Sequence, residues 1–134
     1  MPANGDSLLT PTWYDTVGHV KKVVLDVLFD SGDGSFTSVA LAQKIDGFLL
    51  KLVTDPGATA PTDNYDITIT DAEGFDLLQG LAANRHTTTS QNIEIVMLAT
   101  GNHPAVSATD TLTLNISGNA TISATTQIIL YWTL

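Results

Sequence analysis

The sequence lacks cysteine, so disulfide bonds and thiolate chemistry are excluded, and the fold must be stabilised by packing, with subunit association as a further source. Basic residues are few: five Lys and Arg stand against fourteen Asp and Glu, which gives a formal net charge of −9. This charge repels phosphate backbones, and the basic residues form no continuous stripe, so we expect no nucleic-acid binding. No apolar run approaches the roughly 20 residues that cross a bilayer, so we expect no membrane contact.

A helical pattern of ordinary length is also missing. The one candidate, residues 76–84, is short and is interrupted by Gly80. Several segments instead alternate apolar and polar residues, which is typical of strands. The sets of residues expected to share a strand face are Val23, Leu25, Val27 and Phe29; Phe48, Leu50 and Leu52; Tyr65, Ile67 and Ile69; Ile93, Ile95 and Met97; and Leu112, Leu114 and Ile116.

The C-terminal part of the chain predicts a β-hairpin. The alternating segment 111–117 is followed by Gly118-Asn119, which suits a two-residue turn, and then by the return segment 120–134. From Ile128 to Trp132 this return segment is apolar on both faces. Such a strand is expected either at the centre of a sandwich or beneath another subunit.

These patterns predict an all-β protein, an antiparallel β-sandwich that is jelly-roll-like and has about seven to nine short strands. With 134 residues, the chain has the size of a single domain. We expect a loose N-terminal arm over residues 1–15, which contains two prolines and lacks the basic region and apolar core of a secretory signal. One β-sandwich domain is expected over residues 16–134.

The stretch from Asp55 to Gly80 contains six of the fourteen acidic residues and no Lys or Arg. Asp71, Glu73 and Asp76 could supply carboxylates to a hard cation, but their spacing departs from that of a calcium loop. The alternative is that Asp71–Gly74 forms a turn beside a short strand, with the carboxylates solvated or capping backbone amides. We favour the turn.

Other candidate chemistry is sparse. His19, His86 and His103 have no metal-ligand spacing, and no nucleophile-elbow motif is present. Two glycosylation sequons, at Asn115 and Asn119, matter only in a glycosylating pathway and also fit ordinary strand and turn composition. We therefore expect no enzyme activity, no catalytic residues, no cofactor and no metal.

Two aromatic residues near the N-terminus leave two interpretations open. Trp13 and Tyr14 follow the expected arm and fit no clear strand pattern, so they either pack in the core or contact another subunit or partner. Trp132, in the apolar final segment, is expected in the core.

The segment from Thr54 to Arg85 reads TDPGATAPTDNYDITITDAEGFDLLQGLAANR, and the segments TLTLNISG and IILYW follow it. It resembles a group of small structural proteins encoded by tailed bacteriophages, which share a P-G-x-x-A-P-T-x-x-Y-D-[IV]-T-[IL]-x-D-x-x-G-x-D-[LV]-L pattern, an A-[ND]-R element and a final IxLY strand. The resemblance covers roughly residues 20–134, and the arm has no counterpart. The matching residues include Pro56, Gly57, Ala60, Pro61, Thr62, Tyr65, Asp66, Ile67, Thr68, Asp71, Gly74, Asp76, Leu77, Leu78, Asn84 and Arg85.

The resemblance implies a virion structural protein, a capsid decoration or cement protein that is made in the host cytoplasm and binds the capsid exterior. It implies the major capsid protein as a partner and a homo-oligomer, with a trimer favoured. The residues then expected to contact the capsid or a neighbouring subunit are Leu8, Leu9, Trp13, Tyr14 and Tyr131. A head-completion or tail component of the virion is one alternative, and a carbohydrate-binding or adhesin-like β-sandwich module is another.

Overall fold

The computed structural model describes residues 6–97, 100–107 and 109–134. In these ranges all regular secondary structure is β, without a helix. The strands in the described part of the chain are β1 (Leu8–Tyr14), β2 (Val20–Leu28), β3 (Val39–Ala40), β4 (Gly47–Pro56), β5 (Asp66–Thr70), β6 (Gln91–Glu94), β7 (Ala105–Val106), β8 (Thr113–Ser117) and β9 (Thr125–Thr133).

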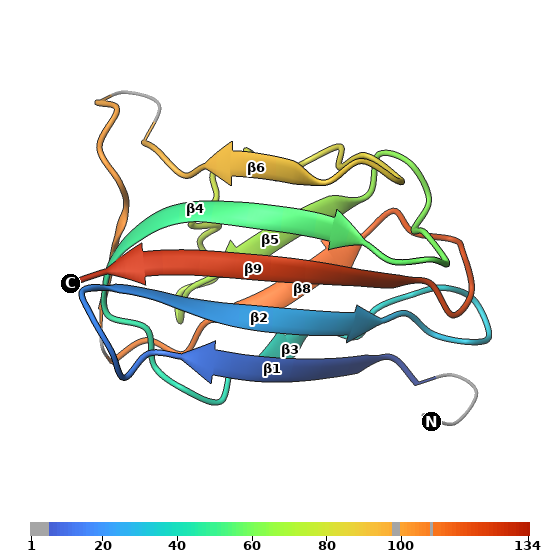
Figure 1. Cartoon of the computed structure of the whole chain (residues 1–134), viewed down its shortest axis with the longest axis horizontal. Coiled ribbons are helices and arrows are strands. Elements are labelled where there is room, and N and C mark those ends of the chain that lie inside the picture. The colour runs from blue at the N-terminus through green and yellow to red at the C-terminus, as the bar shows by residue number, and fades with distance from the viewer. Residues whose placement is uncertain (1–5, 98–99, 108) are drawn as a thin grey trace.

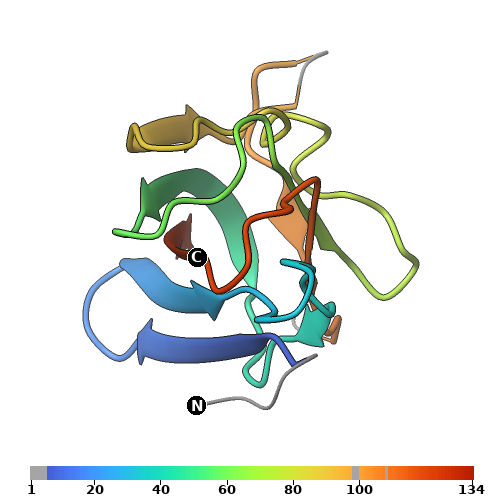
Figure 2. The ribbon, with the colours of Figure 1, turned by 90° about the vertical axis from the view of Figure 1, so that its right-hand side faces the viewer.

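The strands form two antiparallel sheets. The large sheet has the strand order β1-β2-β9-β4-β6, with β7 paired to the start of β4, and the small sheet has the order β3-β8-β5. Figure 1 looks onto the large sheet with the small sheet behind it, and Figure 2 shows the two layers from the side. The all-β sandwich predicted from the sequence is confirmed, while its jelly-roll connectivity stays a prediction.

The core lies between the sheets and follows the predicted alternation in most strands. The residues buried as expected are Val23, Leu25, Val27, Phe29, Tyr65, Ile67, Ile69, Leu112, Leu114 and Ile116. Around β6 the agreement is partial: Ile95 is buried and Ile93 packs against the core, but Met97 is exposed.

The predicted C-terminal hairpin is wrong. β8 pairs with β3 and β5 in the small sheet, whereas β9 pairs with β2 and β4 in the large sheet. The segment 119–124 crosses between the sheets, and Asn119 holds it: Nδ2 donates to Gly34 O at 2.7 Å and Oδ1 accepts from Thr62 N at 2.7 Å. β9 thus takes the central position that its two apolar faces predicted.

The N-terminal arm expected over residues 1–15 is also corrected. Leu8–Tyr14 is an edge strand that pairs with β2 over its whole length, and residues 1–5 lie outside the described residues. Alternate side chains of β1 point inward, and Trp13 packs edge-to-face on Trp132 with ring centroids 6.1 Å apart. This packing anchors β1, and Pro11 is tolerated because an edge strand can spare an N–H.

β4 contains a bulge that the sequence pattern did not predict. The register with β9 shifts between Leu49 and Lys51, so Leu50 is an extra residue in β4. Leu49 and Leu52 are therefore both buried, whereas Phe48, predicted to share a face with Leu52, is 47% exposed. After the bulge, Lys51 and every second residue that follows face away from the small sheet.

Gly47, at the start of β4, provides a test of this packing. Its φ is 108°, and an added Cβ would lie 2.1 Å from Thr133 O. We expect Gly47→Ala to lower the free energy of unfolding by about 3 kcal/mol, because a backbone clash adds to the cost of positive φ. Gly74→Ala is the matched control: its φ is also positive, but its Cβ would meet nothing within 4 Å, so a loss of about 1 kcal/mol is expected. Equal losses in chemical denaturation would contradict the close approach.

Candidate functional site

In the acidic stretch from Asp55 to Gly80, four of the six acidic side chains accept hydrogen bonds from backbone amides: Asp63, Asp66, Asp71 and Asp76. Asp76 Oδ1 accepts hydrogen bonds from Ile69 N at 3.2 Å and Leu78 N at 3.0 Å, and its Oδ2 accepts from Gly80 N at 3.0 Å. The carboxylate of Asp76 therefore ties β5 to the turns that follow it.

Asp71 has a similar role in the predicted turn. Gly74 N donates to Asp71 O at 3.0 Å and closes the turn, while Asp71 Oδ1 accepts from Glu73 N and Phe75 N. Two of the three carboxylates considered for a cation thus cap backbone amides, as the turn interpretation predicted. Among the described residues, no group of three or more His, Asp and Glu side chains could hold a metal ion.

The loop from Asp30 to Gly34 uses carboxylates in the same way. Gly32 N donates to Asp30 Oδ1, and Ser35 N donates to Asp33 Oδ1 at 2.9 Å. The hydrogen bond from the Ser35 amide lowers the pKa of Asp33 below its ordinary value, because it stabilises the charged form. This loop is a turn that its own carboxylates shape.

The histidines lie on separate segments. His86 Nδ1 accepts from Thr88 N and Thr89 N, whereas His103 Nδ1 lies 2.6 Å from Ile95 O. His19 is exposed in the β1–β2 connection. The rings of His86 and His103 thus each contact a backbone group.

The five residues expected to make contacts divide between the two faces of the large sheet. Leu8 and Tyr14 are 47% and 54% exposed on the face turned away from the small sheet, which we call the outer face. Tyr131 is half-buried on the same face. Leu9 and Trp13 point inward and pack against the core, so the core alternative holds for Trp13.

The outer face carries a pattern that the sequence analysis missed. β2 contains KVVLD at 22–26 and β4 contains KLVTD at 51–55. β2 and β4 are parallel to each other because both pair antiparallel with β9, which lies between them. The registers therefore align the outward residues of these three strands in rows across the sheet. The basic row is Lys22, Tyr131 and Lys51; the apolar row is Val24, Ile129 and Val53; the acidic row is Asp26, Gln127 and Asp55.

The side chains of the basic row stack on aromatic rings. Lys22 Nζ lies 5.1 Å from the centroid of the Tyr14 ring, and Lys51 Nζ lies 4.6 Å from that of Tyr131. Such cation–π contacts hold an ammonium over a ring without neutralising its charge. Glu94 of β6 is exposed and in register with Lys51, so this end of the outer face carries two positive charges and one negative charge, and its net charge is positive.

The acidic row is held by neutral partners. Gln127 Nε2 donates to Asp26 Oδ1 at 2.8 Å, and Ser90 Oγ donates to Asp55 Oδ1 at 2.8 Å. Both carboxylates belong to exposed residues. The other end of the outer face is therefore negative.

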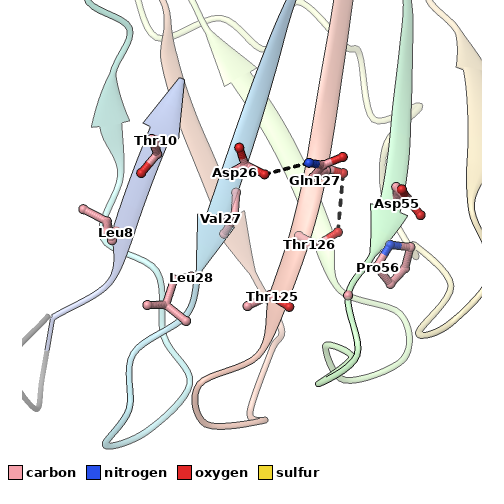
Figure 3. Close-up of a pocket in the computed structure, with 11 residues that line it drawn as sticks. Leu8, Thr10, Asp26, Val27, Leu28, Asp55, Pro56, Thr125, Thr126 and Gln127 are labelled. Atoms are coloured by element: carbon pink, nitrogen blue, oxygen red, sulfur yellow. Dashed lines mark hydrogen bonds between the residues drawn. The ribbon is translucent and has the colours of Figure 1, made fainter. Parts of the chain in front are cut away.

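The outer face is hollowed at both ends. A hollow of about 490 Å³ at the acidic end is lined by Leu8, Asp26, Asp55, Pro56 and Gln127 among others (Figure 3). A second hollow, of about 240 Å³, lies between Tyr14, Lys22 and Tyr131 at the basic end. The apolar row lies between these two hollows.

Comparison with known proteins finds no family model, no curated protein and no solved structure that matches this chain. In the described ranges, no helix is long and apolar enough to cross a membrane.

The structural role of the acidic stretch can be tested at Asp76. We expect Asp76→Ala to lower the free energy of unfolding by about 2 kcal/mol, because three backbone amides lose their acceptor. Glu73→Ala removes an exposed carboxylate from the same turn and is expected to change stability by at most about 0.5 kcal/mol. Thermal and chemical denaturation measure both effects. A melting temperature that rises on adding calcium, and does so less in both variants, would favour a cation site instead.

Proposed function

We propose that this protein is a structural protein of a tailed-phage virion, of the capsid-decoration type, and that it acts by protein–protein contact. The observation that carries the binding part of the proposal is the outer face of the large sheet, where an apolar row lies between a basic row and an acidic row. The virion part rests on the resemblance of the segment from Thr54 to Arg85.

The residues that carry the resemblance serve the fold. Tyr65 is fully buried, and Arg85 N donates to Tyr65 O at 2.7 Å. Asn84 has a φ of 57°, and its backbone N–H donates to Asp66 Oδ1, so Asn84 closes a tight turn. These roles support reading the motif as the signature of one β-sandwich fold. Of the matching residues, Pro56 and Gly57 line the hollow at the acidic end of the outer face, and this face is the best candidate for the contacts that matter for function.

A decoration protein stabilises a shell by mass action, because it binds the assembled lattice and not the free subunits. An oligomer engages several capsomers at once, so that contacts of modest strength add up through effective concentration. The resemblance implies a trimer for this purpose. The outer face supplies one surface through which subunits of such an oligomer, or the capsid, make contact.

The proposal is tested by incubating the protein with emptied capsids of the phage that encodes it and imaging the particles. We expect saturable density at repeated positions on the capsid exterior and a higher melting temperature of the shell. Capsids that keep their native decoration are the control and should take up no further copies. Density confined to one vertex or to the tail would replace decoration by head completion or a tail role. No density at saturating protein would overturn the virion assignment.

The hollow at the acidic end favours a second candidate, a carbohydrate-binding module. Asp26, Gln127 and Asp55 offer hydrogen-bonding groups that suit hydroxyls, and Leu8 and Pro56 offer apolar contacts. Trp13 packs on Trp132 and is therefore not available for stacking on a sugar ring.

A glycan array separates the two candidates. Under the decoration proposal, we expect the wild-type protein to show no saturable glycan binding. Binding that is lost in Gln127→Ala but kept in Ser117→Ala, a change on the small sheet, would favour the carbohydrate-binding module. Wild-type protein that binds no glycan but occupies capsids would exclude it.

A further inference from the structure

The outer face has opposite charges at its two ends, at equal distances from the apolar row. In both β2 and β4 the outward order is Lys, Val, Asp, so each lysine lies two residues before the apolar row and each aspartate two residues after it. The Cα atoms of Lys22 and Asp26 are thus about 13 Å apart along the strand. Lys51 and Asp55 have the same spacing and the same direction.

These four charges form no ion pair within the described part of the chain. The lysines lie over tyrosine rings, and the aspartates accept hydrogen bonds from Gln127 and Ser90. Each side chain is therefore positioned by a contact with an uncharged group, although Glu94 is in register with Lys51 on the neighbouring strand and offsets part of its charge. A partner with the opposite order of charges would compensate all four.

We propose that this partner is a second copy of the chain, packed face to face through the outer face of the large sheet. The two-fold axis lies in the interface, perpendicular to the strands, and passes along the apolar row. Such an axis reverses the direction along the strands but keeps each strand opposite its own copy, as in an isologous dimer. Lys22 then faces Asp26 of the second copy, Lys51 faces Asp55 of the second copy, and the two copies of Ile129 meet on the axis.

The charges also exclude the other simple arrangement. A two-fold axis parallel to β9 would place β2 of one copy over β4 of the other without reversing the rows. Lys22 would then face Lys51 of the second copy, and Asp26 would face Asp55. Like charges in contact across an interface cost free energy, so the reversed packing is the favoured one.

The size of the face is adequate for a dimer. The five main strands have between four and ten residues each, and at about 3.3 Å per residue and about 4.8 Å per strand they make a face of about 600 Å². A stable interface buries about 800 Å² per partner, and side chains extend beyond the flat outline. The dimer would also cover three exposed apolar side chains at the ends of the face: Leu8, Tyr14 and Val20 are 47%, 54% and 58% exposed.

The inference deepens the proposed function, since it names the partner of the surface on which that function rests. It predicts a dimer, or an assembly built from dimers, in place of the trimer that the resemblance implies. The two proposals fail separately, because capsid imaging tests the virion assignment and measurements on the isolated protein test the dimer.

Sedimentation equilibrium over about 1–100 µM protein tests the dimer. We expect the wild type to dimerise, and Lys51→Asp and Asp55→Lys each to weaken dimerisation at least about tenfold, because by symmetry each change turns two attractive contacts into repulsive ones. Lys44→Asp and Asp46→Lys make the same charge changes at exposed positions before β4 and should leave the dimer unchanged. Thermal melts of each variant verify that it is folded. Lys22→Asp and Asp26→Lys repeat the test on β2 with independent contacts.

Mixing the variants gives the decisive result. One variant carries negative charge at positions 51 and 55 and the other carries positive charge at both, so an equimolar mixture of Lys51→Asp and Asp55→Lys should form a heterodimer. The double variant Lys51→Asp/Asp55→Lys should dimerise with itself, because the order of charges is reversed in both copies. A wild type that stays monomeric, a trimer that is insensitive to these changes, or folded variants that fail to associate on mixing would overturn the proposal.

Discussion

The large sheet depends on the pairing of β9 with β2 and β4 along both of its edges. Ile128, Leu130 and Trp132 are buried toward the small sheet, and Ile129 and Tyr131 alternate with them on the outer face. A slip of one residue would turn the buried set outward, so the register of β9 is strongly specified. That register in turn aligns β2 with β4. The buried inner face and the rows on the outer face therefore both follow from the register of β9 with β2 and β4.

Acidic residues serve two different purposes in this protein. In the stretch after β4, Asp71 and Asp76 accept hydrogen bonds from backbone amides and shape the turns. On the outer face, Asp26 and Asp55 accept only from the side chains of Gln127 and Ser90 and remain exposed. The dense stretch from Asp55 to Gly80 therefore contains both groups, because Asp55 belongs to the outer face. Asp26 and Asp55 of the acidic row are 29 residues apart in the chain, and the sheet places both in register with Gln127.

The wrong predictions have a common physical cause: the partners of a strand are set by contacts with residues far away in the sequence, which a local pattern does not contain. The Gly118-Asn119 turn suggested a hairpin, but both edges of β9 are already occupied by β2 and β4. Pro11 and polar residues interrupt the alternation in β1, and this local pattern predicts a loose arm. Trp13 nevertheless packs on Trp132, and this contact holds the segment against the core. The bulge at Leu50 reversed the expected faces at the start of β4, and no residue type in that segment requires it.

The all-β class, the turns at the Asp and Gly clusters and the buried face of β2, β5 and β8 can be predicted from the sequence alone, because period-two alternation and turn chemistry are local properties. The sequence also contains the two K-x-V-x-D segments, but nothing local relates residues 22–26 to residues 51–55. The folded sheet places both segments beside β9, parallel to each other and in register. The reason is that strand order and register are set by non-local hydrogen bonds and by packing across the core, and these created a face with a positive and a negative end.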